Sequence, residues 1–186
     1  MPATRRRLLR SFARTRARTG YDSKFEECML RALRRKLPRG ARVDEQFSVP
    51  HGSHPYRVDA VVTHPAGFRF AIEMDGPGHY QGFTGLRLRE PAEQFSRDRY
   101  VEEYCLREGL SLFRVPYTYA RKPAKAVAYC LAAAIRDFRA GACKIHYLDY
   151  MRTYVHINQY AAATPGVLPL LTTPDETFPQ VNTRGV

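Results

Sequence analysis

The stretch FRFAIEMDGPGHY, residues 68–80, has the pattern of a β-strand followed at once by a turn. Its first seven residues mix β-branched and aromatic side chains, which favours a strand over residues 68–74. The Gly- and Pro-rich sequence that follows predicts a loop over residues 75–92. Because side chains two residues apart on a strand point to the same face, we expect Glu73 and Asp75 to project together where the strand ends.

The sequence on either side of this strand alternates between helical and strand patterns. Upstream, Ser23 and Glu26 fit a capping box, and apolar residues then recur at helical spacing until Pro38 and Gly40. Further strands are predicted at residues 43–49, 56–63 and 110–115, and further helices at residues 92–108 and 121–139. The predicted order of elements is α, β, β, β, α, β, α. This order predicts an α/β (α+β) domain in which helices pack on a mixed β-sheet.

Three parts of the chain differ in composition. Residues 1–20 contain seven arginines and no acidic residue, and residues 21–140 carry the helical and strand patterns. Residues 141–186 lack a sustained period, although residues 145–160 are rich in Tyr and His and are compatible with a last short element. We therefore expect a basic N-terminal arm, one folded domain and a C-terminal extension.

Positive charge dominates the chain. It has 30 Lys and Arg against 18 Asp and Glu, a formal net charge of +12, which favours an anionic polymer or surface as the partner. The arm at residues 1–20 is compatible with three roles: a disordered segment whose Arg5, Arg6 and Arg7 contact phosphates, an organelle transit peptide, or a solvated tail. Because no apolar run approaches the length of a membrane span, we expect a soluble protein without membrane contact.

The four cysteines, Cys28, Cys105, Cys130 and Cys143, are widely spaced and form no CxxC pair. This spacing argues against a zinc site and against a disulfide framework. We expect reduced, mostly buried thiols in an intracellular compartment.

Three carboxylates are predicted to meet at the end of the strand quoted above. Asp59 lies on the preceding strand, and it can lie across from Glu73 and Asp75 if the two strands pair as a hairpin. Clustered carboxylates repel one another, and a divalent cation compensates their charge. Oxygen ligands suit Mg²⁺ or Mn²⁺ rather than zinc, and such a metal activates water for attack on phosphorus. The alternative is that Asp75-Gly76 is an ordinary turn and Glu73 an exposed strand residue.

Two segments, AIEMDGPGHY (71–80) and RDRYVEEYCLREGLSLFRVPY (97–117), resemble the very-short-patch-repair-like endonucleases of the PD-(D/E)XK nuclease superfamily. The resemblance covers about residues 22–118. It implies a restriction-endonuclease-like fold and a Mg²⁺-dependent endonuclease that hydrolyses phosphodiester bonds in DNA. Upstream, the same pattern is matched by Glu26, MLRALR (29–34), Gln46 and YRVDAVV (56–62).

The resemblance also implies roles for single residues. Asp59 and Glu73 match the acidic metal ligands, and Glu26 matches a carboxylate on the first helix that completes the site. Asp75 stands at the position of the lysine in the E-x-K motif, and E-x-D is common in this branch, so we include Asp75 among the catalytic and metal-site residues. His79 matches a histidine that shuttles a proton or contacts phosphate. Contacts with the substrate backbone are predicted for Arg97, Arg99 and Arg114.

Two other functions are compatible with the same sequence. IEMDGPGHY (72–80) also resembles the RAP domain of organellar RNA-binding proteins, which shares this fold. That reading implies a non-catalytic RNA-binding module, with residues 1–20 serving mitochondrial import. The arginine-rich arm and the patternless C-terminal part instead suggest a basic packaging or structural protein. DNA is favoured over RNA as the partner, and a homodimer would suit an enzyme that cuts both strands.

Overall fold

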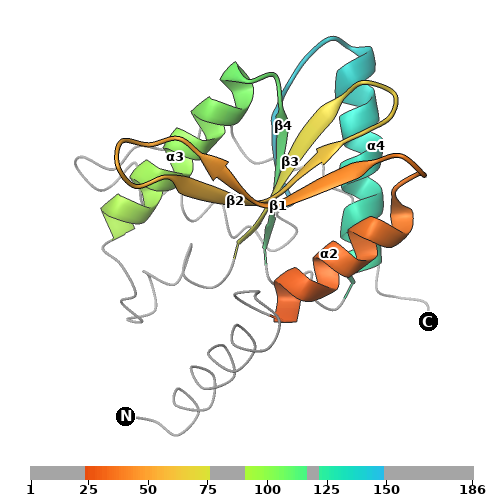
Figure 1. The fold of residues 1–186 in the computed structure, drawn as a ribbon, viewed down its shortest axis with the longest axis horizontal. Coiled ribbons are helices and arrows are strands. Elements are labelled where there is room, and N and C mark those ends of the chain that lie inside the picture. Colours follow the sequence, from red (N-terminus) through yellow and green to blue (C-terminus); the bar gives the residue numbers. More distant parts are fainter. Residues whose placement is uncertain (1–23, 76–90, 117–121, 149–186) are drawn as a thin grey trace, which may run out of the picture.

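A computed structural model describes residues 24–75, 91–116 and 122–148 of the chain (Figure 1). Each helix and strand predicted within these ranges has a counterpart whose ends agree to within two residues. The predicted arm at residues 1–20 lies outside them. The described elements are α2 (Lys24–Lys36), β1 (Arg42–Val49), β2 (Tyr56–Thr63), β3 (Arg69–Asp75), α3 (Pro91–Arg107), β4 (Ser111–Pro116), α4 (Pro123–Arg139) and β5 (Ile145–Tyr147).

The strands form one mixed sheet in the order β1-β2-β3-β4-β5. β1, β2 and β3 pair antiparallel, whereas β4 lies parallel to β3 and β5 lies parallel to β4. A parallel neighbour requires a crossover, and α3 lies in the connection between β3 and β4. β3 and β4 are buried along almost their whole length, as expected for strands with helices on both faces. The prediction of a mixed α/β domain is confirmed.

The short strand β5 extends the sheet beyond the predicted end of the domain. β5 pairs with β4, and the Leu148 N–H donates to the Arg114 carbonyl at 3.0 Å. Ile145 and Tyr147 are buried. The sheet thus includes residues 145–147, within the stretch that was compatible with a last short element. A strand of three residues is too short for a period of two to show in the sequence.

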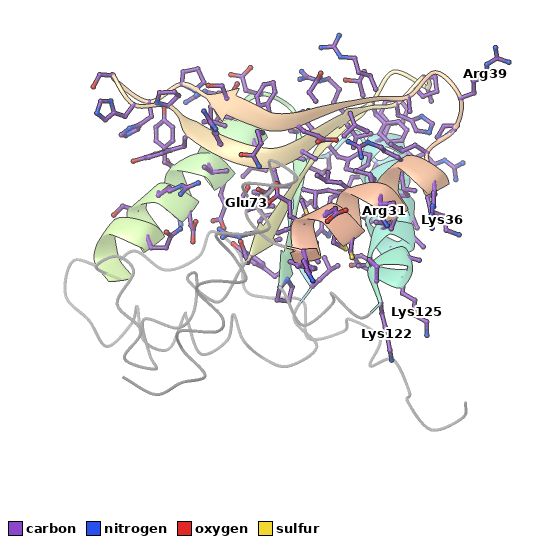
Figure 2. The ribbon with its side chains drawn as sticks, turned by 60° about the horizontal axis from the view of Figure 1, so that its bottom comes forward. Arg31, Lys36, Arg39, Glu73, Lys122 and Lys125 are labelled. Atoms are coloured by element: carbon purple, nitrogen blue, oxygen red, sulfur yellow. The ribbon has the colours of Figure 1, made fainter. Side chains whose placement is uncertain are left out.

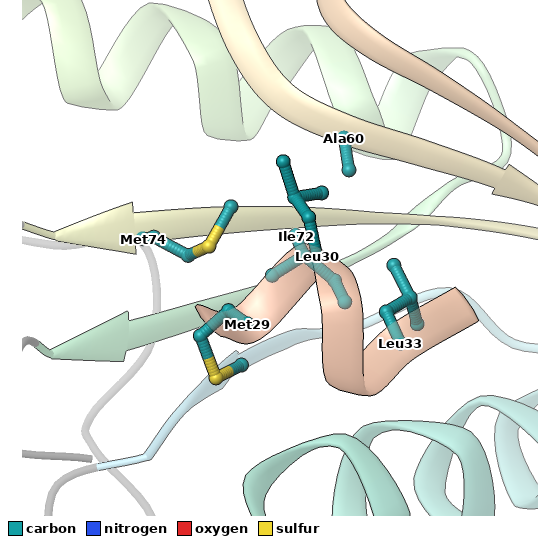
Figure 3. A pocket seen from close by; sticks show the side chains of 6 residues that line it. All are labelled: Met29, Leu30, Leu33, Ala60, Ile72 and Met74. Atoms are coloured by element: carbon teal, nitrogen blue, oxygen red, sulfur yellow. The ribbon is translucent and has the colours of Figure 1, made fainter. Parts of the chain in front are cut away.

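Helices cover the two faces of the sheet unequally. α2 and α4 pack together on one face and α3 covers the other (Figure 1; Figure 2 gives a second view). Because Ile72 and Met74 contact α2, alternation along β3 directs Glu73 to the opposite face, which α3 covers. Figure 3 shows the six apolar side chains through which α2 rests on β2 and β3, namely Met29, Leu30, Leu33, Ala60, Ile72 and Met74.

Single residues set the ends of the helices. α2 ends just before Pro38, as predicted, and the predicted capping residue Ser23 lies outside the described residues. Gly109 follows α3 with a φ of 70°, and the Leu110 N–H donates to the Cys105 carbonyl at 2.8 Å. This is the Schellman arrangement, which glycine adopts with the least strain because it has no Cβ. The helix therefore ends within one residue of the predicted end at residue 108.

All four cysteines are free, and two of them are buried. Cys105 and Cys130 lie in the core, whereas Cys28 and Cys143 are exposed. The prediction of buried thiols is therefore correct for only half of them. Burial raises the pKa of Cys105 to about 12, and the nearby charge of Glu73 acts in the same direction. Among the described helices, none is both long and apolar enough to cross a membrane.

Candidate functional site

β2 and β3 separate at Asp59. Their backbone pairing ends at Ala60 and Ile72. Beyond that point the Asp59 N–H donates to Glu73 Oε2 at 3.3 Å, and the Met74 N–H donates to Asp59 Oδ2 at 2.6 Å. The two carboxylates thus accept hydrogen bonds that backbone carbonyls would accept if the ladder continued. The structure brings Asp59 and Glu73 together across the hairpin, as predicted.

Gln46 links Glu26 to Asp59. Its side-chain amide donates to Glu26 Oε1 at 2.7 Å and to Asp59 Oδ1 at 3.3 Å, which uses both N–H groups of the amide. Gln46 and Asp59 are left out of the backbone pairing between β1 and β2. Gln46 also has a φ of 50°, a conformation that costs a residue with a side chain about 1–3 kcal/mol and that concentrates at functional sites.

Three carboxylates from three elements are therefore linked by hydrogen bonds through Gln46 and the Asp59 backbone. We call them the strand-end carboxylates: Glu26 from α2, Asp59 from β2 and Glu73 from β3. Glu26 and Glu73 are only 3% and 6% exposed, and in Figure 2 Glu73 lies between α2 and α3. Carboxylates buried this deeply repel one another unless a cation, a proton or hydrogen-bond donors compensate their charge. The donors described above are all neutral.

The strand-end carboxylates have the chemistry of a site for a hard divalent cation. Asp59 and Glu73 offer only oxygen, the donor type that suits Mg²⁺ and Mn²⁺. Within residues 24–75, 91–116 and 122–148, no three or more His, Cys, Asp or Glu side chains are grouped so as to hold a metal ion. Protein sites for Mg²⁺ commonly use one or two carboxylates, with water and substrate phosphate supplying the other ligands. Two carboxylates therefore fit the ion that the sequence predicts.

Asp75 lies in a different set of contacts. Arg114 Nε and Nη2 donate to Asp75 Oδ2 and Oδ1 at 2.9 and 2.8 Å. The side chain of Arg114 is 2% exposed and that of Asp75 is 0% exposed. This geometry is the bidentate pairing that binds a carboxylate most strongly. The structure thus differs from the predicted grouping of Asp75 with Asp59 and Glu73, because the neighbouring strand β4 brings a guanidinium to Asp75.

Arg114 is the centre of a buried group of charges, and we call Arg114, Asp75, Asp98 and Glu102 the Arg114 network. Arg114 lies 3.1 Å from Asp98 and 3.1 Å from Glu102, and the Tyr147 hydroxyl donates to Glu102 at 2.7 Å. Burial alone would lower the pKa of Arg114, but the three surrounding carboxylates raise it well above its ordinary value. Burial also raises the pKa of Glu102, against the lowering effects of Arg114 and Tyr147. The network joins α3 to β3, β4 and β5.

The three arginines predicted to reach the substrate have different surroundings. Arg114 is buried, so its position does not agree with a contact to a nucleic-acid backbone. Arg99 pairs with Glu103 at 2.8 Å, one helical turn further along α3. Arg97 is partly exposed, and its guanidinium lies over the ring of Tyr56. The other predicted site residues lie outside the described ranges, namely Arg5, Arg6, Arg7 and His79.

Sequence reasoning missed the acidic partners of Arg114 on α3. Gln94, Asp98 and Glu102 recur every four residues and are buried, and Gln94 donates to Asp98 at 2.8 Å. Residues at this spacing share one face of a helix. A polar stripe on the inward face of a helix, followed by an arginine within an apolar strand, is the signal that identifies such a network. The hydrogen bonds from Gln46 to Glu26 and Asp59 were also missed. The only hint of them in the sequence is that Gln46 belongs to the pattern on which the resemblance to nucleases rests.

The described residues thus form two groups of carboxylates beside one sheet. Comparisons of the chain with protein-family models, with curated proteins and with solved structures found no match. A function therefore has to be inferred from the residues, the contacts and the charges of this chain itself.

Proposed function

We propose that the protein is a metal-dependent endonuclease that hydrolyses phosphodiester bonds in DNA. The observation that carries this proposal is the meeting of Glu26, Asp59 and Glu73 in a chain of net charge +12. An acidic site in a basic protein suits a polyanionic substrate whose hydrolysis uses a metal ion. The resemblance to PD-(D/E)XK nucleases supports the same function, since it implies that Asp59 and Glu73 are metal ligands.

Asp59 and Glu73 are the proposed ligands of Mg²⁺ or Mn²⁺, and Glu26 adds negative charge beside them. When bound, such a cation supplies a Lewis acid for a phosphoryl oxygen and an activated water. The protein holds the ligands in place before any substrate arrives. The Met74 N–H fixes one oxygen of Asp59, and the Gln46 amide fixes the other. This arrangement reduces the reorganisation that metal binding requires.

Asp75 is a positioning residue in this proposal. Its bidentate pair with Arg114 fixes the end of β3 against β4, and Glu73 lies two residues away on the same strand. Because Asp75 stands where the E-x-K motif has its lysine, another side chain has to supply the positive charge near the phosphate. The candidates are His79, Arg97 and Arg99.

Exposed basic side chains on α2 and α4 support an anionic partner. α2 and α4 pack against each other, so their outer residues share one side of the molecule. Arg31 pairs with Glu27 at 2.6 Å and Arg34 pairs with Glu45, whereas Lys36 and Lys125 form no ion pair within the described ranges. Cations without carboxylate partners are available to neutralise phosphates. Figure 2 labels Arg31 and Lys36 on α2, Lys125 on α4, and the nearby Arg39 and Lys122 just outside these helices.

The test uses the purified full-length chain, supercoiled plasmid DNA and Mg²⁺ or Mn²⁺. We expect cleavage that EDTA abolishes. In Asp59→Asn and Glu73→Gln the cleavage rate should fall by at least about 100-fold, which corresponds to an increase of about 2.7 kcal/mol in activation free energy. Both variants should still bind DNA because the basic surface is unchanged.

Glu108→Gln is the matched control for this experiment. Glu108 is an exposed glutamate just after α3, and its variant should cut at the wild-type rate. A correctly folded chain that cuts neither DNA nor RNA with either metal would contradict the proposal.

A second candidate function is a non-catalytic nucleic-acid-binding module, such as an RNA-binding one. The observation that favours it is that Asp75 occupies the position of the usual lysine and is paired with Arg114. That position therefore supplies no basic side chain to the site. Such a module predicts salt-sensitive binding without cleavage. Titration of Mn²⁺, followed by electron paramagnetic resonance, separates the two functions. A site present in the wild type and lost in Asp59→Asn favours the nuclease.

A further inference from the structure

Three aromatic rings contact one another at the tip of the β1–β2 hairpin, and we call His51, Tyr56 and Tyr100 the hairpin-tip cluster. His51 stacks on Tyr56 with ring centroids 4.2 Å apart and planes inclined by 19°. Tyr100, from α3, meets both rings edge-on, with its centroid 4.7 Å from that of His51 and 5.6 Å from that of Tyr56. Figure 1 shows the hairpin reaching across α3.

Hydrogen bonds hold this cluster in place. The Tyr100 hydroxyl donates to the Pro50 carbonyl at 2.6 Å, and the His54 N–H donates to the His51 carbonyl at 3.0 Å, closing the turn. Gly52 has a φ of 48° within the turn, a conformation that suits glycine. His51 is nevertheless exposed. A ring that is both fixed and exposed is preorganised to stack on another planar group.

One arginine places positive charge beside the rings. The guanidinium carbon of Arg97 lies 5.6 Å from the centroid of Tyr56, and Arg97 Nη2 donates to the backbone carbonyl of Arg57 at 3.4 Å. The Arg97 Nε is buried without a hydrogen-bond partner in the described part of the chain. Arg97 also forms no ion pair with a described residue. The surface therefore combines a planar ring with a cation that no described carboxylate pairs with.

The hairpin-tip cluster lies close to the strand-end carboxylates. Tyr56 and Asp59 are three residues apart on β2, which corresponds to about 10 Å at the rise of a strand. That length is about three nucleotides of one strand at roughly 3.4 Å each. A nucleic-acid strand with its scissile phosphate at Asp59 would therefore pass the cluster within a few nucleotides.

We infer that the hairpin tip binds an unpaired nucleotide of the substrate strand, with a nucleobase stacked on His51 and a flanking phosphate on Arg97. This inference rests on the proposed function in taking nucleic acid as the substrate. Stacking on aromatic rings, together with basic side chains along the backbone, is how proteins hold single strands. In a duplex the faces of the bases are covered by their neighbours, so a ring on the protein surface recognises an unpaired base.

Binding of a single-stranded oligonucleotide to the full-length chain, measured in EDTA by fluorescence anisotropy, tests this inference. His51→Ala should raise the Kd about fivefold or more, the loss expected when one base–ring stack is removed. His54→Ala is the matched control because it removes an exposed histidine from the same turn, and it should change the Kd by less than about twofold. His51→Phe keeps a ring at this position and should restore binding. Arg97→Gln should reduce the slope of log affinity against log salt by about 0.7.

A second probe separates stacking from simple attraction to phosphates. An oligonucleotide of the same length with abasic residues should bind the wild type as weakly as the normal oligonucleotide binds His51→Ala. If His51→Ala binds as tightly as His54→Ala, or if the abasic strand binds the wild type as tightly as the normal strand, the inference is overturned. Because EDTA removes the metal, these results do not depend on cleavage. A chain that passes this test and cuts nothing would overturn the proposed nuclease alone.

Discussion

Two groups of carboxylates lie beside the same sheet, and their described partners differ in charge. The Arg114 network contains its own guanidinium, which lies 2.8 to 3.1 Å from Asp75, Asp98 and Glu102. The strand-end carboxylates instead accept described hydrogen bonds from neutral groups, the Gln46 amide and backbone N–H donors. A carboxylate paired with an internal cation is part of the scaffold. The hydrogen bonds described for the strand-end carboxylates fix their positions without bringing in a positive charge.

Burial alone does not separate the two groups. Glu73 is 6% exposed and Asp75 is 0% exposed, although they are two residues apart on one strand. Their neighbours make the difference, because β4 brings Arg114 to Asp75 while α2 and β1 bring Glu26 and Gln46 to Asp59. The type and the burial of a carboxylate therefore indicate its role less well than the charge of its nearest partner does.

Arg114→Met tests the scaffold half of this comparison and has the largest expected effect. Without the guanidinium, three buried carboxylates lose their compensating cation, so we expect the free energy of unfolding to fall by about 3–5 kcal/mol. Urea unfolding followed by circular dichroism measures this change. Arg99→Met breaks the partly exposed pair with Glu103 and should cost no more than about 0.5 kcal/mol. Equal losses in the two variants would show that the Arg114 network is not a distinct source of stability.

Glu102→Gln tests how the same network responds to pH. Burial raises the pKa of Glu102 above its ordinary value of 4.5, so between 4.5 and the raised pKa the folded state holds a proton that the unfolded state has lost. The free energy of unfolding should therefore decrease as the pH rises through this window, by about 1.4 kcal/mol for each unit by which the pKa is raised.

The measurement for Glu102 is a series of urea unfolding curves from about pH 4.5 to pH 8. The decrease attributed to Glu102 should be missing in Glu102→Gln, whose amide does not titrate. Parallel curves for the wild type and the variant would mean that Glu102 does not take up a proton in the folded state.

Gln46→Leu tests the other half of the comparison and has the smallest expected effect. The variant keeps a side chain of similar size but removes the donor shared by Glu26 and Asp59, so we expect a loss of about 1 kcal/mol in the free energy of unfolding. Mn²⁺ should restore part of this loss, because a cation replaces the missing donor. Thermal unfolding with and without Mn²⁺ measures both effects. Ser48→Ala, an exposed position on the same strand, is the control, and equal stability of the two variants would refute a bridging role for Gln46.

The helices and strands could be predicted because their signals are local. β2 spans Tyr56–Thr63, as the turn-rich residues before it and its own composition predict, and Gly109 ends α3 as its lack of a Cβ permits. The strand β5 was not placed because its three residues join the sheet only through contacts with β4. A signal that lies entirely in a distant partner is not visible in a short window of sequence.

The candidate site was partly predictable for the same reason. Asp59 and Glu73 belong to adjacent strands of one hairpin, so strand pairing brings them together in a way that the sequence suggests. The pair of Gln46 with Glu26 spans 20 residues, and the pair of Arg114 with Asp75 spans 39. Neither pair follows from the spacing along any one element.

By itself the sequence determined the elements of this protein, its mixed α/β class and the placing of Glu73 and Asp75 at the end of one strand, because those features depend on periodicity and on turn residues close by in the chain. Only the tertiary structure decided that Asp75 pairs with Arg114 inside the scaffold while Gln46 links Glu26 to Asp59. The physical reason is that compensation of a buried charge depends on distance in space. The packing of β4 and α3 on one side, and of α2 and β1 on the other, sets those distances.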